Sequence, residues 1–284
     1  MDISPADVKK LREKTGAGIM ECKNALASTG GDFAQAEKLL KEKGLAAVEK
    51  RSGRATNEGR VFAGIHEPGN QAVLVELASE TDFVARNPEF IALGELVAGR
   101  ALEKGYAEPN DELNALVSDL AAKIRENMSL RRIRLISAGK DEILSRYIHG
   151  DGAIGVVVKL RSDKPEALAS AELKTLAFDL ALHIAASNPL AVDRGGIDPA
   201  FLKEQEEIFR KQVEQDEKVQ GKPEQVIANI LKGKVNKYLA EVCLLDQGFV
   251  KDDKVTVAQV LADYGKRLGT QLTVSEYGYF KVGQ

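Results

Sequence analysis

The sequence predicts an α+β protein, and three observations lead to that class. The segment before residue 54 carries only helical patterns, two strand hairpins follow with long helices after each, and a polar pair of helices interrupts the second half. Strands and helices that do not alternate strictly favour antiparallel sheets backed by helices. A chain of 284 residues is also long enough for more than one domain.

The N-terminal segment is expected to form three short helices. The first begins at Pro5 and ends near Lys14, and the second ends near Ser28. Asp32 is the candidate N-cap of the third helix, which is predicted to end at Gly44 because glycine is favoured just after a helix. A bundle of this size lies near the lower limit for independent folding.

A weak internal repeat indicates two similar hairpins, over 61–77 and 146–160. Each contains an isoleucine-histidine step, a glycine turn and a valine-rich strand that ends in leucine, with the same spacing from histidine to leucine. A long helical pattern follows each hairpin, at about 88–104 and 170–187. Another helix is expected near 111–128.

The segment 198–243 is predicted to be a projecting antiparallel helical hairpin with coiled-coil-like packing. Asp198 begins the outgoing arm, which is expected to run to about Gln220, and a tight turn starts at Gly221. A few apolar residues stand out on the two arms in a very polar sequence: Leu202, Phe209, Val213, Val226, Ile230, Val235 and Leu239. The chain then closes with a helical pattern and a strand, near residues 257–268 and 271–282.

These patterns divide the chain into three parts. Residues 1–54 are expected to form the three-helix domain and its linker, with a polar stretch over 49–59. Residues 55–140 form the first core subdomain. Residues 141–284 form the second, which includes the hairpin 198–243. The two core subdomains are predicted to be related antiparallel sheets covered by helices.

Composition argues against several classes of function. The formal net charge is only −3, although 29% of the residues are charged, so no strong field favours a polyanion. Two cysteines outside any CxxC pair and three histidines argue against disulfides and zinc. No apolar run approaches the ~20 residues that span a bilayer, and no signal-peptide pattern opens the chain. We expect a cytoplasmic protein without a cofactor.

Two motifs invite catalytic interpretations that the neighbouring residues do not support. Residues 150–155 match GxGxxG, but the valines that follow predict a strand where a dinucleotide site needs a helix, so a hairpin turn is favoured. Glu80 and Asp82 lack the desolvating neighbours of an acid–base pair, and Asp82 is interpreted as an N-cap or a partner contact. The chain is predicted not to be an enzyme. A nucleotide-binding enzyme that uses the glycine turn stays a further hypothesis, which calorimetry with nicotinamide and adenine nucleotides tests.

The basic run Arg131-Arg132-Ile133-Arg134 is interpreted as a strand whose arginines are solvated or ion-paired. Leu130, Ile133 and Leu135 are placed among the arginines as in a half-buried strand. RNA binding stays open, but no aromatic platform accompanies the run. His183 lies in an apolar helical pattern and is expected to pack in a helix interior.

The most informative stretch is Ser-Glu-Thr-Asp-Phe-Val-Ala-Arg-Asn-Pro-Glu-Phe-Ile, residues 79–91. It joins a clear strand to a helix that begins at Pro88, with Asn87 as candidate N-cap. Phe83 therefore lies in a short polar join. Its ring is either a plug over the local core or a contact for another molecule, and the residues alone leave both interpretations open.

This stretch and residues 11–26 (Leu-Arg-Glu-Lys-Thr-Gly-Ala-Gly-Ile-Met-Glu-Cys-Lys-Asn-Ala-Leu) together resemble the paired signatures of the elongation factor Ts family. The resemblance covers nearly the whole chain. It implies an N-terminal ubiquitin-associated-like domain, two core subdomains and a coiled coil. It also implies a guanine-nucleotide exchange factor that binds the GDP form of the GTPase elongation factor Tu and promotes GDP release by displacing Mg²⁺ during translation elongation.

The resemblance further implies a set of site residues. The segment tied to dislodging Mg²⁺ would be Thr81, Asp82, Phe83 and Val84. Further partner contacts would be Ile19, Met20, Ile124, His149 and Val250. No covalent catalysis, membrane or direct nucleic-acid contact is implied.

The helical hairpin motivates two further hypotheses. It could support a homodimer, or the whole chain could be a non-exchanging binding or assembly module. Such a module would bind both nucleotide forms of the GTPase alike, whereas an exchange factor would bind the GDP form more weakly.

Overall fold

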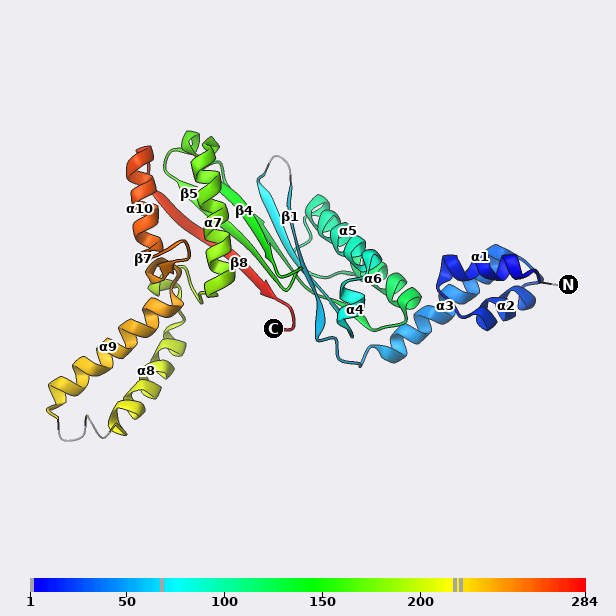
Figure 1. Cartoon of the computed structure of the whole chain (residues 1–284), viewed down its shortest axis with the longest axis horizontal. Coiled ribbons are helices and arrows are strands. Elements are labelled where there is room, and N and C mark those ends of the chain that lie inside the picture. The colour runs from blue at the N-terminus through cyan, green and yellow to red at the C-terminus, as the bar shows by residue number, and fades with distance from the viewer. Residues whose placement is uncertain (1–2, 67–68, 217–218, 220–221) are drawn as a thin grey trace. The chain divides into compact units, whose positions relative to one another are not determined.

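Helices and antiparallel strands make up the structure, a computed structural model that describes residues 3–66, 69–216, 219 and 222–284 (Figure 1). The predicted α+β class is confirmed. The chain divides into two units. The first contains Met1–Ser137, Ile148–Gly155 and Phe280–Gln284, and the second contains Ala138–Tyr147 and Val156–Tyr279.

Three helices open the first unit: α1 (Pro5–Thr15), α2 (Ile19–Ser28) and α3 (Phe33–Arg51). The predicted end of the third helix at Gly44 is wrong, since α3 continues for seven more residues. A Cβ added to Gly44 would lie 3.0 Å from the Cβ of Ala122. Glycine stands there because another helix approaches closely, not because the helix stops. The polar stretch 49–59 therefore shrinks to residues 52–57 between α3 and the first strand.

The first sheet has the order β1-β2-β3, all antiparallel, with bounds β1 (Glu58–His66), β2 (Gln71–Ser79) and β3 (Met128–Ser137). The central strand β2 is almost entirely buried. A β-bulge shifts the register of β3, because Glu76 pairs with Arg132 whereas Leu77 pairs with Leu130. Arg131 is the extra residue. The bulge lets Leu130 and Ile133, three positions apart, both enter the core.

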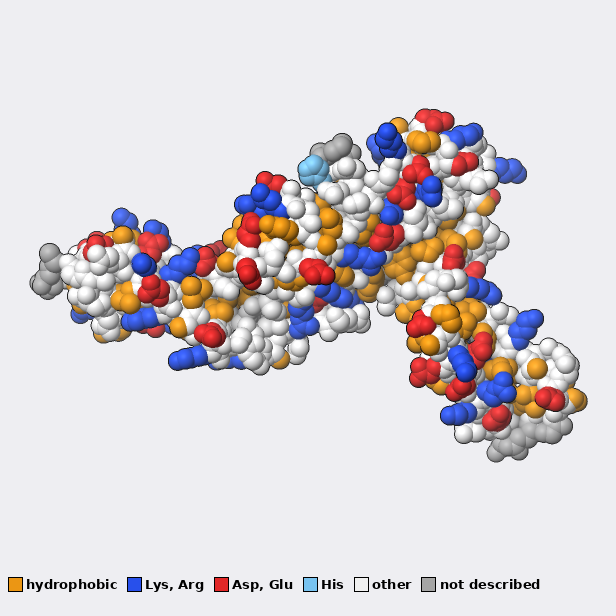
Figure 2. Space-filling view, turned by 180° about the vertical axis from the view of Figure 1, so that it is seen from behind, with side chains coloured by type: hydrophobic (Ala, Val, Ile, Leu, Met, Phe, Trp, Pro, Cys, Tyr) orange, Lys and Arg blue, Asp and Glu red, His pale blue; other side chains and the backbone are white. Residues whose placement is uncertain are grey.

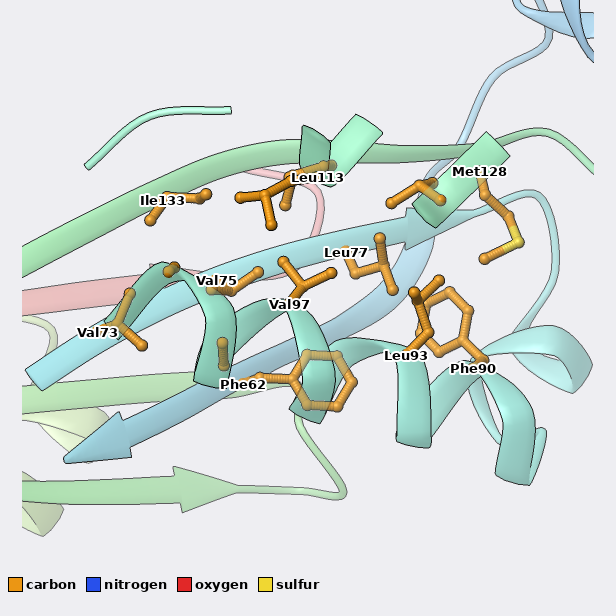
Figure 3. Close-up of a cluster of buried hydrophobic side chains, with 14 of the residues drawn as sticks. Phe62, Val73, Val75, Leu77, Phe90, Leu93, Val97, Leu113, Met128 and Ile133 are labelled. Carbon is orange, nitrogen blue, oxygen red and sulfur yellow. The ribbon is translucent and has the colours of Figure 1, made fainter. Parts of the chain in front are cut away.

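Two helices cover this sheet: α5 (Pro88–Lys104), which packs on β1 and β2, and α6 (Asp111–Ile124), which packs on β3. Figure 3 shows side chains from all three strands and both helices converging in one apolar core. Gly94 permits this packing, because a Cβ there would lie 2.1 Å from the ring of Phe62. The helix predicted near 111–128 ends early, at a left-handed Arg125 with φ of 70°, and Met128 already begins β3.

The second sheet has the order β4-β5-β8, with bounds β4 (Glu142–His149), β5 (Ile154–Ser162) and β8 (Leu272–Lys281). As in the first sheet, a hairpin carries a third strand beside its second arm. The helix α7 (Ala171–Ser187) lies across it in Figure 1. One face of α7 is buried, including Leu173, Leu176, Leu180 and Ile184, as are the valines of β5, whereas Phe178 is 44% exposed. Short elements complete the unit: η1 (Pro165–Ala169), η2 (Arg194–Gly196), η3 (Leu244–Asp246), β6 (Gly248–Phe249), β7 (Asp252–Thr256) and α10 (Val257–Leu268).

The predicted helical hairpin consists of α8 (Pro199–Glu214) and α9 (Glu224–Val242). Phe209 meets Tyr238 edge to face at a ring-centroid distance of 5.6 Å. The outgoing arm stops before the predicted Gln220, since the next apolar residue after Val213 is six positions on and off the helical face. Gly221, the predicted start of the turn, lies outside the described residues.

Candidate functional site

The join after β2 is a single helical turn, α4 (Asp82–Ala85). The Oγ1 of Thr81 accepts a hydrogen bond from the backbone N of Val84 at 3.4 Å, so Thr81 is the N-cap. The interpretation of Asp82 as the N-cap is wrong: Asp82 is the first helical residue. Its carboxylate instead pairs with Arg86, one turn on, at 3.2 Å. Thr81 and Asp82 are both of residue types that commonly cap helices, and only their backbone positions show which of them is the cap.

Phe83 does not plug the core. Its side chain is 80% exposed, whereas the next residue, Val84, is 6% exposed and packs in the core of the first sheet. Covering a phenyl ring is worth about 1.5–3 kcal/mol, so the exposed ring is a source of binding energy that folding leaves unused. A single exposed apolar residue is common on proteins. What distinguishes Phe83 is the set of hydrogen bonds that anchors the turn carrying it.

Three hydrogen bonds from outside the turn hold α4 in place. Arg60 on β1 donates through Nε to the carbonyl oxygen of Ala85 at 2.6 Å. The hydroxyl of Thr81 donates to the carboxylate of Glu126 at 3.0 Å. The carboxylate of Glu80 accepts from the backbone N of Asn127 at 2.6 Å. These supporting residues are not predictable from the sequence, because about 25 to 47 positions separate each pair and no local pattern links them.

Ile19 and Met20 occupy the first turn of α2, with 57% and 63% of their surfaces exposed. The opposite face of α2 is buried in the three-helix core, so the exposure is one-sided. The next residue, Glu21, pairs with Arg125. The Gly18 backbone N–H, and then Arg125, hold the pKa of Glu21 below its usual value. The two apolar side chains are thus presented by an anchored helix start.

Ile124 and His149 complete the predicted contacts of the first unit. Ile124 is the last residue of α6 and is half-buried against the core. His149 is exposed at the end of β4. It precedes a turn in which Gly150, Asp151 and Gly152 all have positive φ, of 57°, 52° and 92°. The GxGxxG match is therefore a hairpin turn, as predicted.

Val250 belongs to the second unit, between β6 and β7, and is 41% exposed. Its backbone N donates to Nδ1 of His183 at 3.1 Å. His183 is fully buried in α7, as expected of a packing residue, and desolvation lowers its pKa. No local pattern in the sequence links His183 to Val250, since 67 positions separate them.

Two arginines of the basic run make contacts within the protein. Arg131 donates to the backbone oxygen of Thr56, and Arg132 pairs with the buried carboxylate of Glu76 at 2.6 Å. On the face drawn in Figure 2, acidic and basic side chains are interspersed without a large area of one sign. Such a surface does not attract a polyanion strongly.

The described part of the chain, residues 3–66, 69–216, 219 and 222–284, contains neither a candidate metal site nor a helix that could span a membrane. No group of three or more His, Cys, Asp or Glu side chains is placed to hold a metal ion. Within the same residues, every helix is too short or too polar for a bilayer crossing.

Comparison with known proteins places the chain in a class and then in a family. The family model described as elongation factor TS matches residues 80–284. The chain is 50% identical to elongation factor Ts of Treponema denticola, with 100% of this chain and 99% of the relative aligned. It is 42% identical to that of Borrelia hermsii over all of both chains, and 40% identical to that of Clostridium acetobutylicum over 99% and 93%.

The scaffold is thus that of a translation elongation factor. The chain belongs to the elongation factor Ts family. Membership implies a nucleotide-exchange role in translation elongation, with elongation factor Tu as the partner.

Proposed function

We propose that this chain is a guanine-nucleotide exchange factor that binds elongation factor Tu with GDP and releases the GDP by displacing Mg²⁺. The observation that carries the proposal is the 80% exposed ring of Phe83 on a turn anchored by Arg60, Glu80 and Glu126. Thr81 to Val84 form the segment that acts on the metal. Thr81 and Val84 hold the turn, and Asp82 and Phe83 enter the partner.

The mechanism needs no covalent step. A bound diphosphate is held by backbone N–H groups, a lysine and Mg²⁺. A ring pushed against the metal site dislodges the ion and leaves the phosphate charge uncompensated, so GDP leaves faster. The exposed ion pair of Asp82 and Arg86 opens at little cost, because both side chains are solvated. The activity belongs to the cytoplasm, where translation takes place.

Docking elsewhere supplies the remaining energy. By linkage, if the factor weakens the binding of GDP to elongation factor Tu, then GDP weakens the binding of the factor by the same ratio. A ~10⁴-fold effect needs about 5.5 kcal/mol of differential contact, more than the ~1.5–3 kcal/mol from covering one phenyl ring. Further anchors are therefore required. The side chains that we assign to them are the exposed Ile19, Met20, His149 and Val250 and the half-buried Ile124.

The test is stopped-flow release of a fluorescent GDP analogue from elongation factor Tu. Phe83→Ala is expected to lower the maximal stimulated rate at least ~10-fold, as removal of a central anchor does. Thermal unfolding should stay unchanged because the ring lies outside the core. Leu96→Ala is the matched control, since it shortens another exposed apolar side chain, 47% exposed on α5 of the same unit. It should release GDP like wild type. Unchanged release by Phe83→Ala would refute the role of the ring.

A binding or assembly module without exchange activity is the second candidate. The α8–α9 hairpin favours it, because Ile208 and Val226 remain 40% and 38% exposed there. Titration of the factor into elongation factor Tu with and without GDP separates the two functions. Equal affinities would support the module and contradict exchange.

A further inference from the structure

The exposed Val250 lies on a short turn in which two nearby residues are buried. Gln247 and Phe249 are each only 6% exposed, whereas Val250 is 41% exposed. On the far side of Val250, Lys251 pairs with the nearly buried carboxylate of Asp179 on α7 at 2.6 Å. The residues on both sides of Val250 thus hold the turn to the body of the second unit.

His183 lies directly beneath this turn. Its side chain is 0% exposed and stands one helical turn after Asp179 on α7. Nδ1 accepts from the backbone N of Val250 at 3.1 Å, and Nε2 faces Oε1 of Gln247 at 3.0 Å. The imidazole also stacks on Phe249, at a ring-centroid distance of 5.9 Å. One side chain therefore touches three residues of the turn.

The hydrogen bonds fix a single tautomer of His183. The backbone N–H of Val250 is always a donor, so Nδ1 must be unprotonated. The amide nitrogen of Gln247 donates to the backbone oxygen of Glu241 at 2.7 Å, which turns the amide oxygen towards the imidazole. Nε2 must then carry the proton. Both ends of the ring require the same neutral form, so the arrangement is internally consistent and fully satisfied.

We propose that His183 is a positioning residue that presents Val250 in a preformed shape for docking. The inference rests on the proposed function, in which Val250 is one of the anchors on elongation factor Tu. A turn ordered before binding does not lose conformational entropy on binding, so its contact contributes more to affinity. The role concerns docking affinity, since the metal-displacing segment lies on Phe83 and its turn.

Two amide variants separate the two hydrogen bonds of the ring. In His183→Asn the side-chain oxygen takes the place of Nδ1 and still accepts from Val250. In His183→Gln the amide reaches the place of Nε2, keeps the bond to Gln247 and loses the one to Val250. Each variant removes one buried bond and the aromatic stack, so the two are matched for general destabilisation. A merely structural role would not distinguish them.

Hydrogen exchange on the free protein is the first readout. His183→Asn should keep the protection of the Val250 amide near its wild-type level, and His183→Gln should lose most of it. Equal protection in the two variants would overturn the positioning role. This readout does not involve the partner, so it stands whatever the proposed function turns out to be.

GDP release from elongation factor Tu is the second readout. His183→Gln should raise the concentration of factor at half-maximal rate by ~3–10-fold, as loss of one hydrogen bond predicts, with the maximal rate unchanged. His183→Asn should restore most of the affinity. A fall in maximal rate, or equal shifts in both variants, would contradict the inference.

Val250→Ala keeps the inference testable even if an amide variant does not fold. It is a surface change and should raise the half-maximal concentration at least as much as His183→Gln. An unchanged value for Val250→Ala would overturn the docking role. Wild-type protein that does not accelerate GDP release at all would instead overturn the proposed function itself.

Discussion

At the scale of single residues, the site depends on side chains that stay outside the core and on others that hold them there. Phe83 is exposed because the residues around it cap, anchor or bury the turn. Val250 is exposed in the same way above His183. In both cases an apolar contact is presented by polar bonds made at some distance along the chain. Rigid support of this kind makes an exposed side chain useful for recognition.

Burial of His183 has a consequence for stability against pH. Desolvation lowers the pKa of His183 in the folded state below its usual value of 6.5. The unfolded chain therefore takes up the proton first, and stability falls as pH drops below about 6.5 towards the folded pKa. We expect the free energy of unfolding of wild type to decrease more steeply from pH 7 to 5 than that of His183→Asn. Urea titrations at several pH values measure the difference.

The comparison keeps the other charges constant. Asp179 and Lys251, the ion pair next to His183, are present in both proteins. If the free energy of unfolding depended on pH in the same way in both proteins, a group other than His183 would be responsible for that dependence.

Sequence patterns predicted caps well and contacts poorly at this scale. Asp32 and Asn87 are N-caps where expected, because a cap is a local interaction. Thr81 and Asp82 are both cap formers in adjacent positions, so the local pattern did not choose between them. Glu126 lies 45 positions from Thr81, and no period or motif predicts that contact.

At the scale of elements, the periodicity of apolar residues predicts the helices and strands. The predicted boundaries are wrong where tertiary packing determines the end of an element. The hairpins, the long helices after them and the α8–α9 pair were all predicted from local patterns. The role of Gly44 was not predicted, because a glycine that ends a helix and a glycine that lets a neighbouring helix approach look alike in sequence. Only the approach of Ala122 separates the two cases.

Gly44 therefore gives a test of helix packing. Gly44→Val should destabilise the protein by about 1–3 kcal/mol, since the branched side chain overlaps Ala122. Gly233 is the matched control: it lies inside α9, and a Cβ there meets nothing within 4 Å. Gly233→Ala should stabilise by up to about 1 kcal/mol through helix propensity. Thermal unfolding of both variants measures the contrast. A tolerated Gly44→Val would show that α3 and α6 do not pack closely in solution.

At the scale of the whole molecule, sequence-distant segments complete both sheets. The third strands, β3 and β8, join their sheets far along the chain from the hairpins that they extend. Local patterns predicted the strands but did not assign their neighbours. Within the first unit, residues Phe280–Gln284 return to β2 and β3. Glu76 on β2 accepts from the backbone N of Gly283 at 3.0 Å, and Arg132 lies over the ring of Phe280 at 4.2 Å.

Glu76 is therefore expected to tie together segments from three distant parts of the sequence. Its carboxylate is 0% exposed and also pairs with Arg132. Glu76→Ala should cost about 2–4 kcal/mol of unfolding free energy, because it leaves Arg132 and the Gly283 N–H without their acceptor. Glu76→Gln keeps a neutral acceptor and should cost less. Urea denaturation orders the variants, and equal stability of Glu76→Ala and wild type would contradict this role.

The exposed ring of Phe83 also makes the chain convenient to observe. The sequence contains no tryptophan. An indole in place of that ring would be the sole one, so its emission would come from the tip of α4 without background. Surrounded by water in the free factor and enclosed in a complex, it would turn the contact itself into an optical signal.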